Sequence, residues 1–246
     1  MNEQIPTLFE RLSKEYKNAF IQFNVQYRMN EQISELSNKC VYNGEMKCDV
    51  KNKNYKLKID FNLLNKKNFK LLNENKSKIT LDVFKDIINP NKSVVFIEYK
   101  NLFKEKELIE ANYVNKIEIN LIKELLILLN YCNYNLNDIG VITPFLEQEK
   151  NMHKELKEIG FNNVYTIDKS QGSEKEIIII SFVKTSYNNS IVNDLARINV
   201  AFTRAKKKLI IFGIKDILIK YDNVERYINK IEEMHFVYEL SLKKFI

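Results

Sequence analysis

The stretch from Val164 to Gly213 constrains this chain more than any other part of its sequence. It contains a short β-branched segment, the polar loop DKSQGSEK, the apolar run IIIISF, and the amphipathic segment NDLARINVAFTRAKK leading into LIIFG. The apolar runs have no polar face, which is typical of strands in a parallel sheet that is covered on both sides. With strands and helices alternating along the chain, the sequence predicts a doubly wound α/β domain.

The amphipathic segment is predicted to be one helix with two distinct faces. At about 100° per residue, its apolar residues fall within one sector: Leu195, Ile198, Phe202 and Ala205. Arg197 and Arg204, seven positions apart, lie on the opposite side. A solvated charged face is the ordinary alternative. However, only five of the 39 basic residues are arginine. Arginine supplies a bidentate donor fork that lysine lacks, so its use at Arg28 and Arg204 indicates recognition of phosphate.

One of the five glycines, Gly172, lies in the middle of the polar loop, between Asp168 and Glu174. We expect it to adopt a positive φ and to let a ligand approach the backbone closely. An ordinary turn between two strands is the alternative.

Apolar patterning and turn residues predict the remaining elements. Strands are expected at residues 20–25, 94–99 and 139–143 and near Val164, Ile177 and Leu209, and helices at residues 30–39 and 111–130. A further helix is expected to be capped by Thr143, to begin at Pro144 and to end at Gly160. The predicted organisation is a lead-in helix and strand (1–24), the main domain (25–213) with a solvated Lys/Asn-rich insertion (about 50–92), and a helical tail (214–246).

Polar residues follow several of the predicted strands. Tyr27 and Arg28 follow the first, residues 143–145 follow another, and residues 168–174 follow the next. Ligands of parallel α/β sheets bind at the carboxyl ends of the strands. The sequence therefore predicts one site at that edge of the sheet.

Four segments carry a resemblance to a known family. VYTIDKSQGSEKEIIIISF resembles motif V, LARINVAFTRAK resembles motif VI, and VQYRMNEQISELSNKCVYNGEMKC resembles motif IV of superfamily 1 helicases. DIGVITPFLEQ resembles the segment ahead of their motif V. The group includes the nonsense-mediated-decay RNA helicase and senataxin. Residues 36–44, Cys48 and the Asp168-Lys169 pair are most similar to the replication helicase/nucleases that process Okazaki flaps.

The resemblance implies a RecA-like fold, the second of two motor domains that bind ATP with Mg²⁺ between them. By its motifs, Arg28 and Arg204 would reach the γ-phosphate as arginine fingers. Tyr27 would pack beside the adenine, with a buried structural role as the alternative. A second set would contact the ribose and phosphates: Gln171, Gly172 and Glu174. For Arg197, an ion pair between motifs VI and V is favoured over contact with ATP.

The same resemblance implies binding of single-stranded nucleic acid, with DNA favoured over RNA. Thr143, Thr166 and Lys169 match positions that contact its backbone, although Thr143 could simply cap a helix and Thr166 could simply belong to a strand. Movement from 5′ to 3′ in DNA replication or repair, in the nucleus, is implied as well. Two departures from the family's motifs bear on affinity and on the coupling of ATP hydrolysis to movement. Ala196 replaces the first of a pair of arginines, and Ser170 stands where relatives often carry a bulkier residue.

Other features limit the function classes. The sequence contains no GxxxxGK[ST] phosphate loop, so most ligands of ATP and Mg²⁺ are expected from a first RecA-like domain, in the same or a partner chain. Without it, the chain is expected not to hydrolyse ATP. Three cysteines cannot hold the four-cysteine cluster of the family's nuclease part. A net charge of +7 favours a polyanionic partner, and no apolar run is long enough to predict a membrane span. An RNA helicase of the decay or termination type and a non-catalytic nucleic-acid-binding remnant stay open as alternatives.

Overall fold

The computed structural model describes residues 8–19, 21, 23–63, 79–102, 113–188 and 190–240. In this part of the chain, the main sheet has the strand order β5-β4-β6-β7-β3-β8, and every pair of neighbours is parallel. Its strands are β3 (Val94–Glu98), β4 (Ile139–Thr143), β5 (Val164–Thr166), β6 (Lys175–Ser181), β7 (Ala205–Gly213) and β8 (Val237–Glu239). The predicted doubly wound α/β fold is confirmed.

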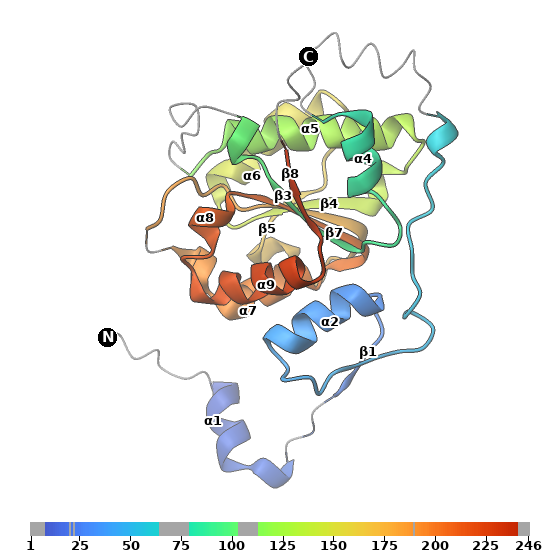
Figure 1. Ribbon diagram of the computed structural model, residues 1–246. Helices are drawn as coiled ribbons and strands as arrows, with labels where there is room; N and C mark the ends of the chain where they lie inside the picture. The colour runs from blue at the N-terminus through green and yellow to red at the C-terminus, as the bar shows by residue number, and fades with distance from the viewer. Residues whose placement is uncertain are drawn as a thin grey trace.

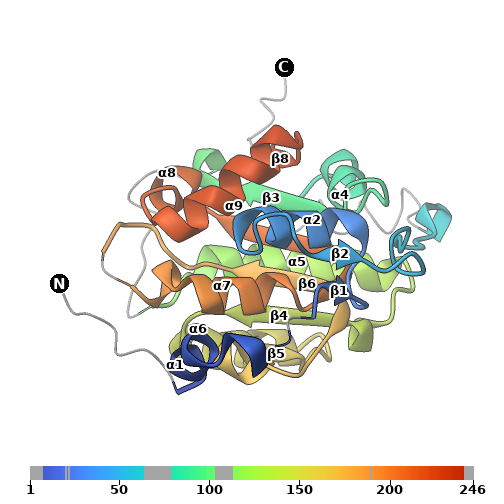
Figure 2. The same ribbon diagram turned by 90° about the horizontal axis from the view of Figure 1, so that it is seen from below.

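Helices cover both faces of this sheet (Figure 1). They are α2 (Glu31–Cys40), α4 (Leu81–Ile87), α5 (Lys116–Tyr131), α6 (Leu146–Lys157), α7 (Leu195–Phe202), α8 (Lys215–Leu218) and α9 (Asp222–Glu233), whereas α1 (Leu8–Glu15) lies away from the sheet (Figure 1). One core cluster lies between the sheet and α4, α5 and α6, and the second lies under α2, α7 and α9. Figure 2 shows α2, α7 and α9 side by side across the second face. Because side chains alternate along a strand, Val95 and Ile97 enter the first cluster while Val94 and Phe96 enter the second.

A small unit ahead of the main sheet positions Arg28. The short strands β1 (Val25–Gln26) and β2 (Lys47–Cys48) precede and follow α2 in the sequence, and they pair with each other in parallel. Asn30 caps α2, since its side chain accepts a hydrogen bond from the Ile33 amide. The Asn30 side-chain amide also donates to the Lys207 carbonyl at 3.0 Å, and the Asn30 backbone amide donates to the Lys206 carbonyl at 3.0 Å. These bonds tie the segment that carries Arg28 to the start of β7.

The predicted long helix through Arg204 is wrong, because α7 ends at Phe202. From Ala205 onward the backbone belongs to β7, where Ala205 pairs with Lys175 of β6. The strand that contains the apolar run LIIFG thus begins at Ala205, further toward the amino terminus than the apolar residues alone indicated. Arg204 lies in the turn between helix and strand and does not share a helical face with Arg197.

The start of α6 also differs from the prediction. Thr143 remains in β4, where it pairs with Thr166 of β5, and its carbonyl accepts a hydrogen bond from Ile167 at 3.1 Å. The helix therefore begins at Leu146, two residues after Pro144, and Phe145 occupies the cap position. Two other predicted elements are shorter: the first strand is only Val25–Gln26, and α5 begins at Lys116 after its cap Asn115.

The predicted insertion and tail both contribute to the core. Ile79, Phe84 and Ile87 are fully buried beneath the sheet, so this end of the insertion is not simply solvated. Its Lys/Asn-rich residues 64–78 lie outside the described residues. The tail residues form α8 and α9, and β8 then adds a strand beside β3. Within the described ranges, no helix is long and apolar enough to cross a membrane.

Candidate functional site

A cavity of about 420 Å³ lies between the β1–α2 connection and the first residues of β6 and β7. Polar and aromatic side chains dominate its lining, which is formed by Gln26, Tyr27, Arg28, Met29, Tyr55, Glu174 and Lys206. Segments far apart in the sequence meet there because Asn30 holds the β1–α2 connection against β7. Residues of predicted motifs IV, V and VI therefore share one cavity.

Arg28 is oriented by a fixed turn and by two contacts with its neighbours. The Gln26 side-chain oxygen accepts from the Arg28 amide at 2.9 Å, which holds the turn after β1. The Arg28 Nε donates to Glu174 Oε2 at 2.6 Å, and its Nη1 donates to the Thr203 carbonyl at 3.1 Å. The guanidinium thus lies beside the residue that directly precedes Arg204.

Glu174 is shared between two cations. Lys206 Nζ lies 2.7 Å from its Oε1, and Arg28 Nε lies 2.6 Å from its Oε2. The hydrogen bond from Lys206, followed by that from Arg28, lowers the pKa of Glu174 below its ordinary value. The group carries two positive charges and one negative charge at neutral pH, so it retains an excess of hydrogen-bond donors for an anion.

Arg204 follows Thr203, whose carbonyl binds Arg28, and is largely buried, with 9% of its surface exposed. Its Nε donates to the Val200 carbonyl at 3.0 Å. Burial, and then the nearby charge of Arg28, lower the pKa of Arg204, while Glu174 opposes that effect. Two guanidinium groups held close together disfavour each other, and an anion placed between them would relieve that repulsion.

The predicted carboxyl-edge location is wrong for these residues. Glu174 immediately precedes β6 and Arg204 immediately precedes β7, so both lie at the amino ends of parallel strands. The loop that contains Glu174 begins at the carboxyl end of β5 and must return to the opposite edge, because β6 runs parallel to β4 and β5. By contrast, Thr143 and Thr166 end their strands at the carboxyl edge, as predicted.

Tyr27 and the polar loop are open to solvent. Tyr27 is 69% exposed, which removes the buried structural alternative for its side chain. Gln171 and Gly172 are exposed too, and Gly172 has the predicted positive φ, at +87°. Nothing lies within 4 Å of the position that a Cβ would take at Gly172. The loop therefore leaves room for a ligand beside its backbone.

Arg197 has the geometry of the predicted ion pair. Its Nε donates to Asp168 Oδ1 at 3.0 Å, and its Nη1 donates to Asp194 Oδ2 at 3.1 Å. Asp168 belongs to the polar loop and Asp194 caps α7, so Arg197 fastens the start of that helix to the loop. Neither contact brings it into the cavity.

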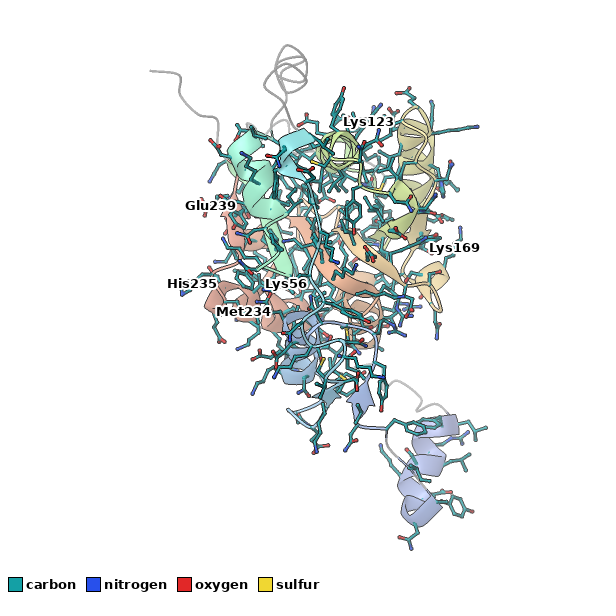
Figure 3. All side chains as sticks on the ribbon, turned by 90° about the vertical axis from the view of Figure 1, so that its right-hand side faces the viewer. Lys56, Lys123, Lys169, Met234, His235 and Glu239 are labelled. Carbon is teal, nitrogen blue, oxygen red and sulfur yellow. The ribbon has the colours of Figure 1, made fainter. Side chains whose placement is uncertain are left out.

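The three residues predicted to contact nucleic acid differ in accessibility. Thr143 is fully buried, and its hydroxyl lies 3.5 Å from the Phe145 amide, so direct contact by that hydroxyl is not supported. Thr166 is half-buried and accepts from the Lys169 amide at 3.3 Å. Lys169 is exposed and its Nζ lies 2.9 Å from both oxygens of buried Glu149. Lys169 lies at the β5 side of the molecule, opposite Glu239 at the β8 side (Figure 3).

Residues 5–216 match a family model described as an AAA domain. The chain belongs to this family. It is 31% identical over 251 residues to the human DNA replication ATP-dependent helicase/nuclease DNA2, covering 97% of this chain and 22% of the human protein. It is 35% identical over 239 residues to an uncharacterised ATP-dependent helicase of Methanocaldococcus jannaschii, covering 95% of this chain and 33% of that protein. The fission yeast relative of DNA2 is 29% identical over 238 residues, covering 96% of this chain and 17% of that protein.

The resemblance drawn from the four motifs is thus confirmed at the level of the family. The chain spans 33% or less of each of these relatives. Four residues that line the cavity were missed by sequence reasoning: Gln26, Met29, Tyr55 and Lys206. Lys206 lies two positions after Arg204 within the family's motif VI, which was the available signal.

Replacing Gly172 with alanine is expected to cost about 1 to 2 kcal/mol of unfolding free energy, since a Cβ is disfavoured at positive φ. Gly44→Ala is the matched control, because Gly44 has φ +85° and equally open surroundings but lies away from the cavity. Denaturant unfolding should show similar losses in the two variants. A loss in Gly172→Ala much smaller than that in Gly44→Ala would contradict the expected strain at Gly172.

Glu174 should titrate below its ordinary pKa, and Lys206→Met should move that pKa back upward, because the Lys206 hydrogen bond is the largest cause of the shift. A carboxylate with a lowered pKa stabilises the fold above its unfolded pKa, and the contribution is lost as the pH falls through the folded value. Side-chain carboxyl NMR titration measures this directly. Lys53→Met, which removes a partner of Glu31 instead, should leave the Glu174 titration unchanged.

Proposed function

We propose that this chain is the second RecA-like domain of an ATP-dependent helicase that moves along single-stranded DNA. The observation that carries the proposal is the meeting of Arg28, Glu174 and Lys206 in one cavity, with buried Arg204 near enough for its charge to interact with Arg28 and Glu174. Donors of this kind fit a polyphosphate, because guanidinium and ammonium groups form short, charge-assisted bonds to phosphate oxygens. The membership of the AAA-domain family and the similarity to ATP-dependent helicases support the same assignment.

In this proposal, Arg28 and Arg204 act on the phosphoryl group that is transferred. Arg28 exchanges its bond to Glu174 for a phosphate oxygen, and Arg204 adds a second cation at the same place. Such arginines stabilise the charge that develops in the transition state and typically raise the rate about 10³- to 10⁵-fold. Tyr27 packs beside the adenine, while Gln171, Gly172 and Glu174 approach the ribose and phosphates. Mg²⁺, which the first RecA-like domain would hold, would neutralise charge at the phosphates.

Helix α7 offers a physical link between the cavity and the residues proposed to contact nucleic acid, Lys169 and Thr166. Arg204 follows its last turn, and Arg197 in its first turn is bonded to Asp168, which adjoins Lys169. A helix of this length spans about 12 Å and moves as a rigid body. A displacement of Arg204 during hydrolysis would therefore also move Lys169 and Thr166. We propose that these two residues contact the phosphate backbone of the single-stranded nucleic acid.

DNA is favoured over RNA because the human and fission yeast relatives are both DNA replication helicase/nucleases by name. With that substrate, we infer a role in replication or repair in the nucleus, with movement from 5′ to 3′ as the family resemblance implies. The first RecA-like domain would be supplied by the same chain or by a partner.

The test uses the native protein, captured with an antibody raised against this chain. We expect a mass well above 29.3 kDa and an ATPase that oligo(dT) stimulates more strongly than oligo(U) does. Stimulation by RNA alone would favour the RNA helicase, and a protein of 29.3 kDa that binds oligonucleotides without any ATPase would leave a non-catalytic binding module.

A further inference from the structure

Two stacked aromatic rings lie at the carboxyl edge of the sheet, apart from the cavity. The centroids of the Tyr113 and Phe145 rings are 4.8 Å apart, and the ring planes differ by 24°. Tyr113 is 49% exposed, whereas Phe145 is 9% exposed and belongs to the core. One ring of the pair is therefore anchored in the protein, and the other is presented to solvent.

A buried cation supports this stack. Lys184 is fully buried, and its Nζ lies 5.4 Å from the centroid of the Tyr113 ring and 5.7 Å from that of Phe145. A cation at these distances is attracted to the electron-rich faces of both rings. The attraction holds Tyr113 over Phe145 even though half of its surface is exposed.

The backbone on either side of the stack has an unusual conformation. Tyr113 has φ +61°, and Val183, next to Lys184, has φ +71°. Residues other than glycine rarely adopt positive φ, and for a β-branched residue it is a true outlier. Such conformations persist only where surrounding contacts enforce them, and they cluster at functional sites.

A buried hydrogen-bond network holds the backbone at Val183 and at Asn115, two residues after Tyr113. The Asn115 side-chain amide donates to the Val183 carbonyl at 3.0 Å, and the Val183 amide donates to Glu118 Oε2 at 3.0 Å. Gln148 accepts from the Asn115 amide at 2.9 Å and donates to the Ser181 hydroxyl at 3.0 Å. Asn115, Glu118, Gln148 and Ser181 are all buried. The network joins the ends of α5, α6 and β6 and fixes the two segments that carry Tyr113 and Lys184.

We propose that Tyr113 is a stacking platform for one base of a single-stranded nucleic acid. An exposed aromatic ring that is already rigid can bind a base without losing further conformational freedom, and stacking of this kind tolerates any base. The platform rests on the proposed function, since it assigns a base contact to the strand whose backbone Lys169 and Thr166 would hold.

The position of the platform fits that strand. Phe145 occupies the cap position of α6, and Glu149, one turn later, binds Lys169 through both carboxylate oxygens. The platform and Lys169 therefore flank the same first turn of α6, at the edge where β4 and β5 end. A backbone contact and a base contact can thus serve neighbouring parts of one strand.

The test measures binding of fluorescent oligo(dT), and of an abasic strand of equal length, by anisotropy. Tyr113→Ala should weaken oligo(dT) binding about tenfold and leave binding of the abasic strand unchanged. Tyr113→Phe keeps the ring and should bind as the wild type does. Tyr131→Ala is the matched control, because Tyr131 is 38% exposed at the opposite end of α5. A 2-aminopurine base in the strand should lose fluorescence on binding to the wild type but not to Tyr113→Ala.

The outcomes separate this proposal from the proposed function. If the wild type binds oligo(dT) and Tyr113→Ala binds it equally well, the platform is refuted and the helicase assignment stands. If Tyr113→Ala weakens both strands equally, the ring does not stack on a base, and the platform is again refuted. If the wild type binds neither strand while thermal unfolding shows that it is folded, the nucleic-acid part of the proposed function fails first.

Discussion

Under the proposed function, replacing Arg28 or Arg204 with alanine should lower the ATPase rate of the assembled protein by about 10³-fold or more, as loss of an arginine finger does in other nucleotide hydrolases. The reason is geometric: Arg28 lines the cavity, and Arg204 lies close enough for its pKa to respond to Arg28 and Glu174. Steady-state ATPase with saturating oligo(dT) measures the effect, and oligo(dT) binding without nucleotide should change little.

Two further variants sharpen this result. Arg28→Lys and Arg204→Lys keep the charge but lose the planar fork, so we expect most of the activity to stay lost. Arg226→Ala changes an exposed arginine on α9 and should leave the ATPase intact. An Arg204→Ala enzyme with normal turnover and a normal melting temperature would remove Arg204 from the reaction.

Replacing Glu118 with alanine is expected to lower the free energy of unfolding by about 3 kcal/mol, which is typical when a buried carboxylate is removed from its partners. Glu118 is fully buried and accepts hydrogen bonds from the Tyr99 hydroxyl at 2.8 Å, from the Val183 amide at 3.0 Å and from the Ser181 hydroxyl. Alanine would leave those donors without their acceptor inside the protein. Equilibrium unfolding in urea measures the loss.

The matched control is Glu158→Ala. Glu158 also forms an ion pair, with Lys123, but its side chain is 69% exposed, so its removal should cost much less stability than removal of Glu118. Glu118→Gln keeps one acceptor oxygen and should lose less stability than Glu118→Ala. A Glu118→Ala loss as small as that of Glu158→Ala would mean that the network does not hold the carboxyl edge together.

Much of the fold was predictable because its strands are apolar on both faces. The runs IIIISF and LIIFG can be satisfied only by a sheet covered on both sides, and they form β6 and β7 at its centre. The conformation of Gly172 was predictable for a local reason as well, since a glycine in a tight polar loop readily takes a positive φ, here +87°. In each case the physical cause lies within a few residues of its effect.

The candidate site was only partly predictable. The sequence indicated Arg28, Glu174 and Arg204, but it placed Arg204 on a helix and the whole group at the carboxyl edge. In the structure, Ala205 pairs with Lys175 of β6, 30 positions away in the sequence. This pairing places Ala205 in β7, so α7 ends before Arg204. Helical periodicity carries no information about such a partner.

By itself, the sequence determined the parallel α/β architecture, the helicase motifs and the positions of the few arginines. Hydrophobic patterning, turn chemistry and residue type depend only on residues close together in the sequence. Only the tertiary structure decided which edge holds the cavity, that Lys206 shares Glu174 with Arg28, that Thr143 is buried, and that Tyr113 stands exposed on Phe145. These features depend on strand register and on contacts between distant segments, whose energies arise only when the whole sheet has assembled.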